Sequence, residues 1–198
     1  MAMPTRHRGT VLTQAGLGLG IGELLGLRVA DVDFLRRTVR VEWQFTSGSR
    51  ERSEPKTARS RRTIPAPQVV LDAIAGHRAS YPAGAGGAVS TTTAGTPLGH
   101  VYDGHDLFRK AVASAGLPEG RTSHDLRHHF ASLLLAAGES VIAVAERLGH
   151  DNAALVLSTY GHLVPDSEDR TRRAVDAAWG AAAEPCAPDV PQGGRSLR

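Results

Sequence analysis

The chain has 198 residues, 41% of them hydrophobic, and a formal net charge of +3. This length suits one domain of ordinary size with a tail, and the apolar content excludes a wholly disordered chain. Neither a secretory signal nor a membrane span is expected, because the N-terminus lacks an apolar run and no stretch of about 18 apolar residues occurs. The single cysteine, Cys186, excludes an internal disulfide, which fits a reducing cytoplasm.

The basic residues are almost all arginines. Of the 23 Lys and Arg residues only Lys56 and Lys110 are lysines, and the sequence pI is about 9.5. Arginine presents a planar fork of donors that matches phosphate oxygens. The composition therefore agrees with a polyanionic partner.

Composition divides the chain into three parts. Residues 1–15 are polar and poorly patterned, and we expect them to be loose. Residues 16–180 are the expected folded domain. Residues 181–198 are rich in Pro and Gly and are expected to form a disordered tail.

The first half of the domain is predicted to contain one helix and a small sheet. Residues 21–29 place three aliphatic side chains on one side of a helix. Apolar and polar side chains alternate in residues 39–44, which predicts a strand. Two further short strands are expected around Ser53 and at 61–64, giving a three-stranded antiparallel sheet.

The rest of the domain is predicted to be helical. The expected helices are 67–80, 103–117 with Asp103 as N-cap, 123–137 bounded by Ser123 and Gly138, 140–149 capped by Ser140, 152–163 and 165–179. The predicted fold class is therefore α+β, mainly α-helical, with one small antiparallel sheet.

Glycines alternate at positions 16, 18, 20 and 22. A dinucleotide-binding loop needs G-x-G-x-x-G after a strand, and none of the possible starting glycines has the third glycine at that spacing. The Gly-Lys-Ser/Thr ending of a Walker loop is also absent. The stretch therefore predicts a helix start weakened by glycine, since an interior glycine costs about 1 kcal/mol relative to alanine.

Helix 123–137 carries the densest set of reactive side chains. We expect His124, Arg127 and His128 on one face, so that an imidazole and a guanidinium project together. The opposite, core face is expected to hold Leu126, Phe130, Leu133, Leu134 and Ala137. Two alternatives are a solvated polar face and a metal site built on His124, His128 and His129, although no further ligand stands at a metalloprotease spacing.

Two more candidate residues follow this helix. His150 comes directly after Gly149, where a histidine alone is typical of a helix C-cap. Tyr160 stands near the end of a short helix, where a tyrosine alone is typical of a half-buried core position.

The combination of H-x-x-R, L-G-H and T-Y-G-H, in this order and spacing, resembles the tyrosine recombinase (phage integrase) family. The resemblance extends over about residues 16–179, the family's catalytic domain. "GIGELLGLRVADVDF" resembles the segment after the first catalytic arginine, and "PKTARSRRTIP" resembles the hairpin with the catalytic lysine. "HDLRHHFASLLL", "RLGH" and "STYGHLVPDS" resemble the remaining motifs.

The resemblance implies a DNA strand transferase. Tyr160 would attack a phosphodiester of double-stranded DNA to form a 3′-phosphotyrosyl link, and Lys56 would protonate the leaving 5′ oxygen. Arg127 would hold the non-bridging oxygens, His124 would assist proton transfer, and His150 would donate a hydrogen bond to the same phosphate. No metal ion or cofactor is expected, because cationic side chains supply the charge. A homo-oligomer is expected on DNA, and no membrane partner.

The predicted hairpin carries three arginines, Arg59, Arg61 and Arg62, that could contact the DNA backbone. The alternative for these three side chains is a solvated basic turn.

The chain departs from the family's pattern in two places. Gly20 stands where the family has its first catalytic arginine, and Arg28 is not an obvious substitute. We therefore expect impaired activity; the alternative function is a non-catalytic DNA-binding remnant or a modulator of recombination. Residues 1–15 resemble neither the family's helical DNA-clamping domain nor its longer apolar helix, so an N-terminal truncation is expected.

Overall fold

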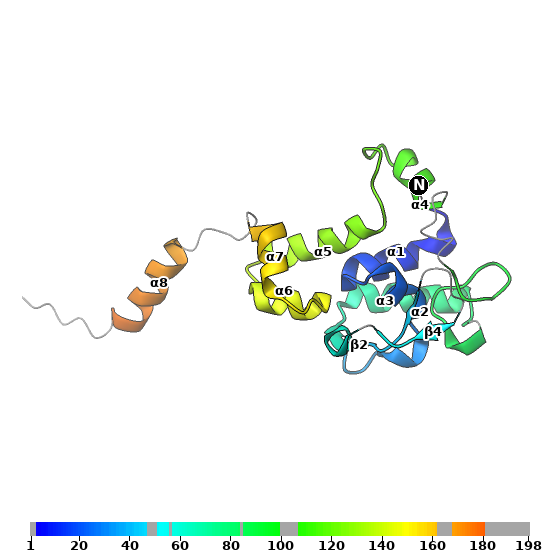
Figure 1. Cartoon of the computed structure of the whole chain (residues 1–198), viewed down its shortest axis with the longest axis horizontal. Helices are drawn as coiled ribbons and strands as arrows, with labels where there is room; N and C mark the ends of the chain where they lie inside the picture. Colours follow the sequence, from blue (N-terminus) through cyan, green and yellow to red (C-terminus); the bar gives the residue numbers. More distant parts are fainter. Residues whose placement is uncertain are drawn as a thin grey trace, which may run out of the picture. The chain divides into compact units, whose positions relative to one another are not determined.

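The computed structural model describes residues 3–46, 51–55, 57–83, 85–99, 107–161 and 168–180. The chain divides into two units, residues 1–164 and residues 165–198, and the described part of the second is helix α8 (Glu168–Trp179) (Figure 1). The first unit contains α1 (Thr5–Leu17), α2 (Ile21–Gly26), α3 (Gln68–Ser80), α4 (Leu107–Ser114), α5 (His124–Ala136), α6 (Val141–Leu148) and α7 (Ala153–Tyr160). The predicted mainly helical α+β class is confirmed.

The strands form two antiparallel sheets instead of the single sheet that we predicted. They are β1 (Val32–Asp33), β2 (Thr38–Val41), β3 (Gln44–Phe45), β4 (Arg52–Ser53) and β5 (Arg62–Pro65). The order β1-β2-β5 makes the three-stranded sheet, with Val39 opposite both Val32 and Ile64. The strand at Ser53 pairs with β3 in a separate two-stranded sheet.

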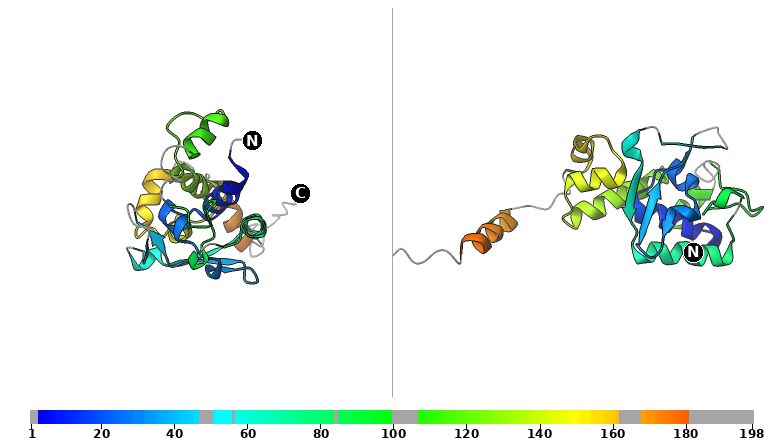
Figure 2. Two further views of the ribbon diagram at one scale, coloured as in Figure 1. Left: turned by 90° about the vertical axis from the view of Figure 1, so that its right-hand side faces the viewer. Right: turned by 90° about the horizontal axis from the view of Figure 1, so that it is seen from below.

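Two apolar cores hold the first unit together. The larger core packs α1, α2 and α3 against the three-stranded sheet, and its fully buried side chains include Leu17, Leu24, Val39, Ile64 and Leu71. Helix α5 contacts α1 and continues into the second core with α6 and α7 (Figure 2). That second core contains Phe130, Leu135, Val144, Leu148 and Val156, with Tyr160 at its end.

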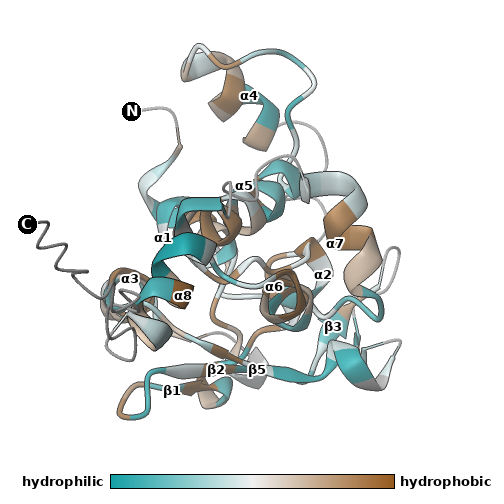
Figure 3. Ribbon diagram, turned by 90° about the vertical axis from the view of Figure 1, so that its left-hand side faces the viewer, coloured by the Kyte–Doolittle hydropathy of each residue, from teal (hydrophilic) through white to brown (hydrophobic). Residues whose placement is uncertain are grey.

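The expectation that residues 1–15 are loose is wrong for the described part, because α1 covers Thr5–Leu17 and packs on α3 and α5. Its buried residues are Thr10, Thr13, Gln14 and Leu17, which have the i, i+3, i+4, i+7 spacing of one helix face. Three of these four are polar, and most of α1 is hydrophilic in Figure 3, so a hydrophobic pattern could not reveal the helix. Both hydroxyls have partners: Thr13 donates to the Gly9 carbonyl at 2.7 Å, and Thr10 shares a hydrogen bond with Ser90 at 3.1 Å.

Helix α2 is shorter than predicted, since it ends at Gly26 and not at residue 29. A Cβ atom on Gly26 would lie 2.7 Å from the Trp43 carbonyl oxygen, and one on Gly22 would lie 2.5 Å from that of Phe45. These glycines therefore allow α2 to lie directly on the backbone of β3 and the residue before it.

The helices from α5 to α7 begin and end close to where the sequence predicted, and Ser140 caps α6 by accepting a hydrogen bond from Ala143 N. The expected Asp103 cap lies outside the described residues. The predicted faces of α5 need correction. Leu133 is 57% exposed, whereas Arg127, Phe130, Ala131 and Leu135 point inward at i, i+3, i+4 and i+8. Arg127 therefore lies on the inner face and not opposite it.

In the described part of the chain, no helix combines the length and apolar character that crossing a bilayer requires.

Gly18 ends α1 with φ of +63°, and a Cβ atom there would lie 2.3 Å from the ring of Phe130. Gly18→Ala should lower the free energy of unfolding by about 2–4 kcal/mol, from left-handed strain and overpacking. The matched control is Gly76→Ala on the exposed side of α3, which has open space around it and should gain about 0.5–1 kcal/mol. Urea denaturation of both variants checks this, and equal effects would contradict the assigned packing of Gly18.

Candidate active site

A single carboxylate, that of Glu23 on α2, connects two buried arginines. Nη1 of Arg62 donates to Oε1 of Glu23 at 2.6 Å and Nη2 donates to Oε2 at 2.9 Å, a bidentate pair. Nη1 of Arg127 lies 3.5 Å from the same Oε2. The three side chains are only 7% to 12% exposed. Two guanidinium groups and one carboxylate leave the cluster with one net positive charge.

Backbone carbonyls hold both guanidinium groups in place. Arg127 donates to the Gly18 carbonyl at 2.9 Å and to the Leu148 carbonyl, at the ends of α1 and α6. Arg62 donates through Nε to the Arg147 carbonyl at 2.7 Å. Carbonyls at helix C-termini lack helical partners and carry partial negative charge, so they suit cations.

Gly149 of the "RLGH" motif has a structural explanation. It ends α6 with φ of +70°, and a Cβ atom there would lie 2.8 Å from Nη1 of Arg62. Glycine is thus favoured for two reasons: it adopts the left-handed conformation at the helix end, and it leaves space for the guanidinium of Arg62. The next residue, His150, emerges beside the cluster.

The positive charge of Arg127 acts on the pKa of both His150 and Tyr160. Burial, and then the positive charges of Arg127 and Arg62, lower the pKa of His150. Burial raises the pKa of Tyr160, and Arg127 opposes that rise. Burial also lowers the pKa of Arg127, but a guanidinium stays protonated in proteins at neutral pH.

The Tyr160 hydroxyl is in hydrogen-bond contact with Nδ1 of His128, one of the two side chains that the sequence placed beside Arg127. The ring of His128 in turn meets that of His124 edge-on, with centroids 4.6 Å apart. His124 is exposed, and its interaction with His150 contributes to lowering the pKa of His150. The predicted residues His124, Arg127, His150 and Tyr160 therefore gather at one place.

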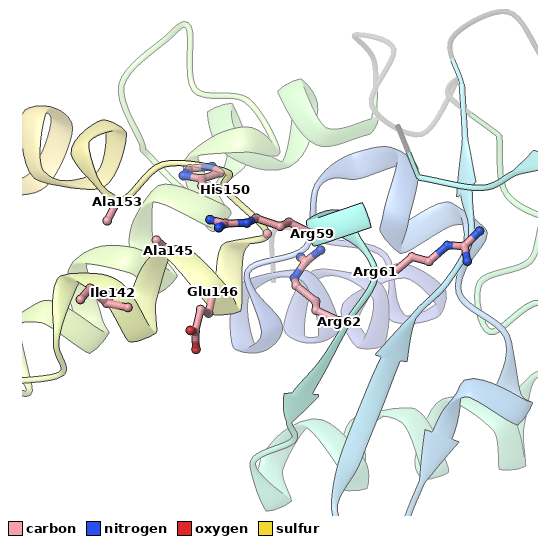
Figure 4. Close-up of a pocket in the computed structure, with 9 residues that line it drawn as sticks. Arg59, Arg61, Arg62, Ile142, Ala145, Glu146, His150 and Ala153 are labelled. Atoms are coloured by element: carbon pink, nitrogen blue, oxygen red, sulfur yellow. The ribbon is translucent and has the colours of Figure 1, made fainter. Parts of the chain in front are cut away.

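A pocket of about 450 Å³ adjoins His150 and is lined by all three hairpin arginines (Figure 4). Arg59 extends toward the loop of His150 and donates to the Asp151 carbonyl at 2.6 Å. Arg61 points the other way and pairs with the exposed Glu54. Arg62 is buried with its donors committed to Glu23 and backbone carbonyls, so in this structure it supports the site and is not an exposed DNA contact.

Gly20 lies at the edge of the Glu23 cluster. Its amide donates to Oε2 of Glu23 at 2.8 Å, and its backbone is extended, with φ of −63°. A Cβ atom there would lie 3.6 Å from Oε2 of Glu23 and 3.9 Å from Nη1 of Arg127, which is ordinary van der Waals contact. Neither conformation nor space requires glycine at this position, unlike Gly18. Because Gly20 precedes α2 as its N-cap, the predicted helix-interior penalty does not apply.

Arg28 is engaged in contacts of its own. It pairs with the buried Asp31, with Nε to Oδ2 at 3.0 Å and Nη2 to Oδ1 at 2.6 Å. Its guanidinium also lies 5.1 Å from the centre of the Trp43 ring. These contacts hold Arg28 at the sheet and make it a structural residue.

The predicted Lys56 lies outside the described residues. Within the described part, no group of three or more His, Cys, Asp or Glu side chains could hold a metal ion. Sequence reasoning missed Glu23, and it gave His128 no part in strand transfer. Glu23 stands in the recognised "GELL" run, but its pairing with Arg62, 39 positions away, has no local sequence signal.

Residues 2–166 match the model of the phage integrase family. The chain belongs to this family. Its curated relatives include the tyrosine recombinase XerC-like protein of Caldanaerobacter subterraneus subsp. tengcongensis, 31% identical over 81% of this chain and 46% of the relative. Another is the tyrosine recombinase XerD of Corynebacterium glutamicum, 31% identical over 82% of this chain and 50% of the relative. The chain thus spans about half the length of these relatives.

Solved integrase structures share the fold. The Tn1549 transposon integrase, in complex with circular intermediate DNA, is 27% identical with a TM-score of 0.71, over 87% of this chain and 60% of that one. The catalytic domain of bacteriophage HP1 integrase matches with a TM-score of 0.53 at 21% identity, over 89% of this chain and 84% of that domain.

Removing the carboxylate charge of Glu23 should destabilise the chain strongly. Glu23→Gln leaves two buried cations without their counter-charge and should cost about 3–5 kcal/mol of unfolding free energy. Glu54→Gln is the matched control, because the Glu54–Arg61 pair is exposed and worth less than about 1 kcal/mol. Chemical denaturation measures both. A Glu23→Gln variant as stable as Glu54→Gln would show that the Glu23 carboxylate does not stabilise the fold.

Proposed function

We propose that this chain is the catalytic part of a tyrosine recombinase that cuts and rejoins double-stranded DNA through a 3′-phosphotyrosyl intermediate, with its activity impaired at Gly20. The observation that carries the proposal is the convergence of Arg127, His150 and Tyr160 from three separate segments beside one buried positive cluster. Family membership and the relatives' names as recombinases and integrases support it.

In the proposed reaction, the hydroxyl oxygen of Tyr160 attacks the scissile phosphorus, and the bond from phosphorus to the 5′ oxygen breaks. Negative charge then concentrates on the non-bridging oxygens, which Arg127 and His150 stabilise in the proposed reaction. Lys56 protonates the leaving 5′ oxygen. Arg59 follows Lys56 by three positions and contacts Asp151, which supports a place for this hairpin beside His150.

The phosphotyrosyl link preserves the energy of the broken phosphodiester bond, so that rejoining needs no nucleotide cofactor. A 5′-hydroxyl from another strand reverses the same step. Cutting and rejoining thus use one set of side chains, and we propose that copies of this chain assemble on DNA to exchange strands.

The proposed impairment follows from the positive charge that a glycine at position 20 does not supply. In the family an arginine at this position would place a second guanidinium beside the phosphate. Here Glu23 holds Arg62 in a bidentate pair, and we assign the phosphate to Arg127, whose Nη1 and Nη2 in this structure donate to the Gly18 and Leu148 carbonyls. The loss of one preorganised donor costs about 3–4 kcal/mol of transition-state stabilisation.

The absence of an arginine at position 20 also favours a second candidate, a non-catalytic DNA-binding protein that modulates recombination. It would use the pocket of Arg59 and His150 to bind phosphate without breaking the strand. The two candidates differ in whether a covalent protein–DNA adduct forms.

Tyr160→Phe should abolish the adduct while leaving the fold intact, because it removes only the attacking hydroxyl. The substrate is a library of end-labelled duplexes, randomised around a nick that lets the released fragment diffuse away, and the readout is a denaturant-resistant labelled band. Tyr81→Phe, at the end of α3, is the matched control and should retain the parental band. Adduct that persists in Tyr160→Phe would refute Tyr160 as the nucleophile.

Gly20→Arg should raise the rate of adduct formation by about 10²–10³ relative to the parent chain, which corresponds to the missing donor. Gly20→Met, of similar length and no charge, is the control and should stay at the parental rate. Single-turnover measurements on sequences selected from the library give the rates. Rapid cleavage by the parent, unchanged in Gly20→Arg, would show that another cation already serves the phosphate.

A further inference from the structure

The contact between Tyr160 and His128 is unexplained by the proposed roles of His124, Arg127 and His150. Nδ1 of His128 and the Tyr160 hydroxyl form a hydrogen bond between α5 and α7. Tyr160 is 7% exposed and His128 is half-buried. Around them the two helices pack through Phe130, Leu135 and Val156, so the second core fixes both side chains.

We propose that His128 accepts the proton of Tyr160 as its hydroxyl attacks the phosphate. This inference rests on the proposed function and adds a catalytic residue to that site. In the step, the bond between Oη and phosphorus forms as the bond to the 5′ oxygen breaks. The hydroxyl proton passes to Nδ1 of His128, which becomes an imidazolium, and the 5′ oxygen takes a separate proton from Lys56.

The environment of the phenol requires such an acceptor. Burial raises the pKa of Tyr160 above its ordinary value of 10.0, so the side chain is a neutral phenol at physiological pH. A neutral phenol is a weak nucleophile, and attack becomes easier when a base in hydrogen-bond contact takes the proton. His128 already makes that contact.

The acceptor role determines the tautomer of His128. A neutral imidazole that accepts at Nδ1 carries its hydrogen on Nε2. The titratable and charged side chains recorded beside the pair in the described residues are His124, edge-on to His128, and Arg127, whose charge acts on Tyr160. The matched control must therefore leave His124 and Arg127 in place. A substitution of the exposed His129 on the same helix meets this condition.

The kinetic test compares His128→Gln with His129→Gln in the Gly20→Arg chain. His128→Gln should slow adduct formation by about 10²–10⁴ at neutral pH. Its rate should then rise about tenfold per pH unit, because the phenol must lose its proton to solvent, whereas His129→Gln keeps the parental rate and profile. A parental rate in His128→Gln, or a slower rate with an unchanged pH profile, would overturn the proposal.

A measurement without DNA separates this inference from the proposed function. Nitrogen NMR of the histidine-labelled full chain should show His128 with its hydrogen on Nε2, and the Nδ1 resonance should move in Tyr160→Phe. A hydrogen on Nδ1, or a resonance that ignores Tyr160→Phe, would contradict the acceptor role. If the NMR result is as expected but no variant forms an adduct, strand transfer itself fails, and the proton-transfer step fails with it.

Discussion

The carboxylate of Glu23 is the contact that joins the parts of the candidate site. It binds Arg62 from β5, lies against Arg127 from α5 and accepts the amide of Gly20. These groups come from the start of α2, the sheet and the long helix that leads to the second core. Two buried guanidinium groups side by side would repel each other without this counter-charge. Glu23 therefore allows two buried guanidinium groups to lie side by side near His150 and Tyr160.

The glycine-rich stretch contains two kinds of glycine, those that packing requires and one that it does not. Gly18, Gly22 and Gly26 are needed, because a Cβ atom on each would come closer than 3.0 Å to Phe130 or to a neighbouring backbone. Gly20 is different, since its backbone and surroundings admit a side chain that would begin beside Arg127. Packing thus accounts for these three glycines, whereas Gly20 is the position at which we propose that a functional side chain is absent.

Local sequence signals predicted the helices that contain the motifs, including the Ser140 cap and the Gly149 end, because caps and left-handed ends depend on a few adjacent residues. They failed for α1, whose buried face of Thr10, Thr13 and Gln14 is polar. They also gave the wrong inner face for α5, since Arg127 points inward to meet carbonyls and Glu23, which no periodicity of apolar residues reveals. Of the predicted residues, His124, Arg127, His150 and Tyr160 lie together, whereas Lys56 is outside the described residues; the ion pairs of Glu23 that hold Arg62 and Arg127 are long-range.

The covalent intermediate is the most direct test of this account. The Gly20→Arg chain is incubated with the nicked duplex library, the DNA is digested with nucleases, and the residual nucleotide is located on the protein by mass spectrometry. The account predicts a nucleotide joined through its 3′-phosphate to Tyr160, in the tryptic peptide that begins at Leu148. A nucleotide on another residue, a 5′-phosphate linkage, or no covalent nucleotide at all would contradict it.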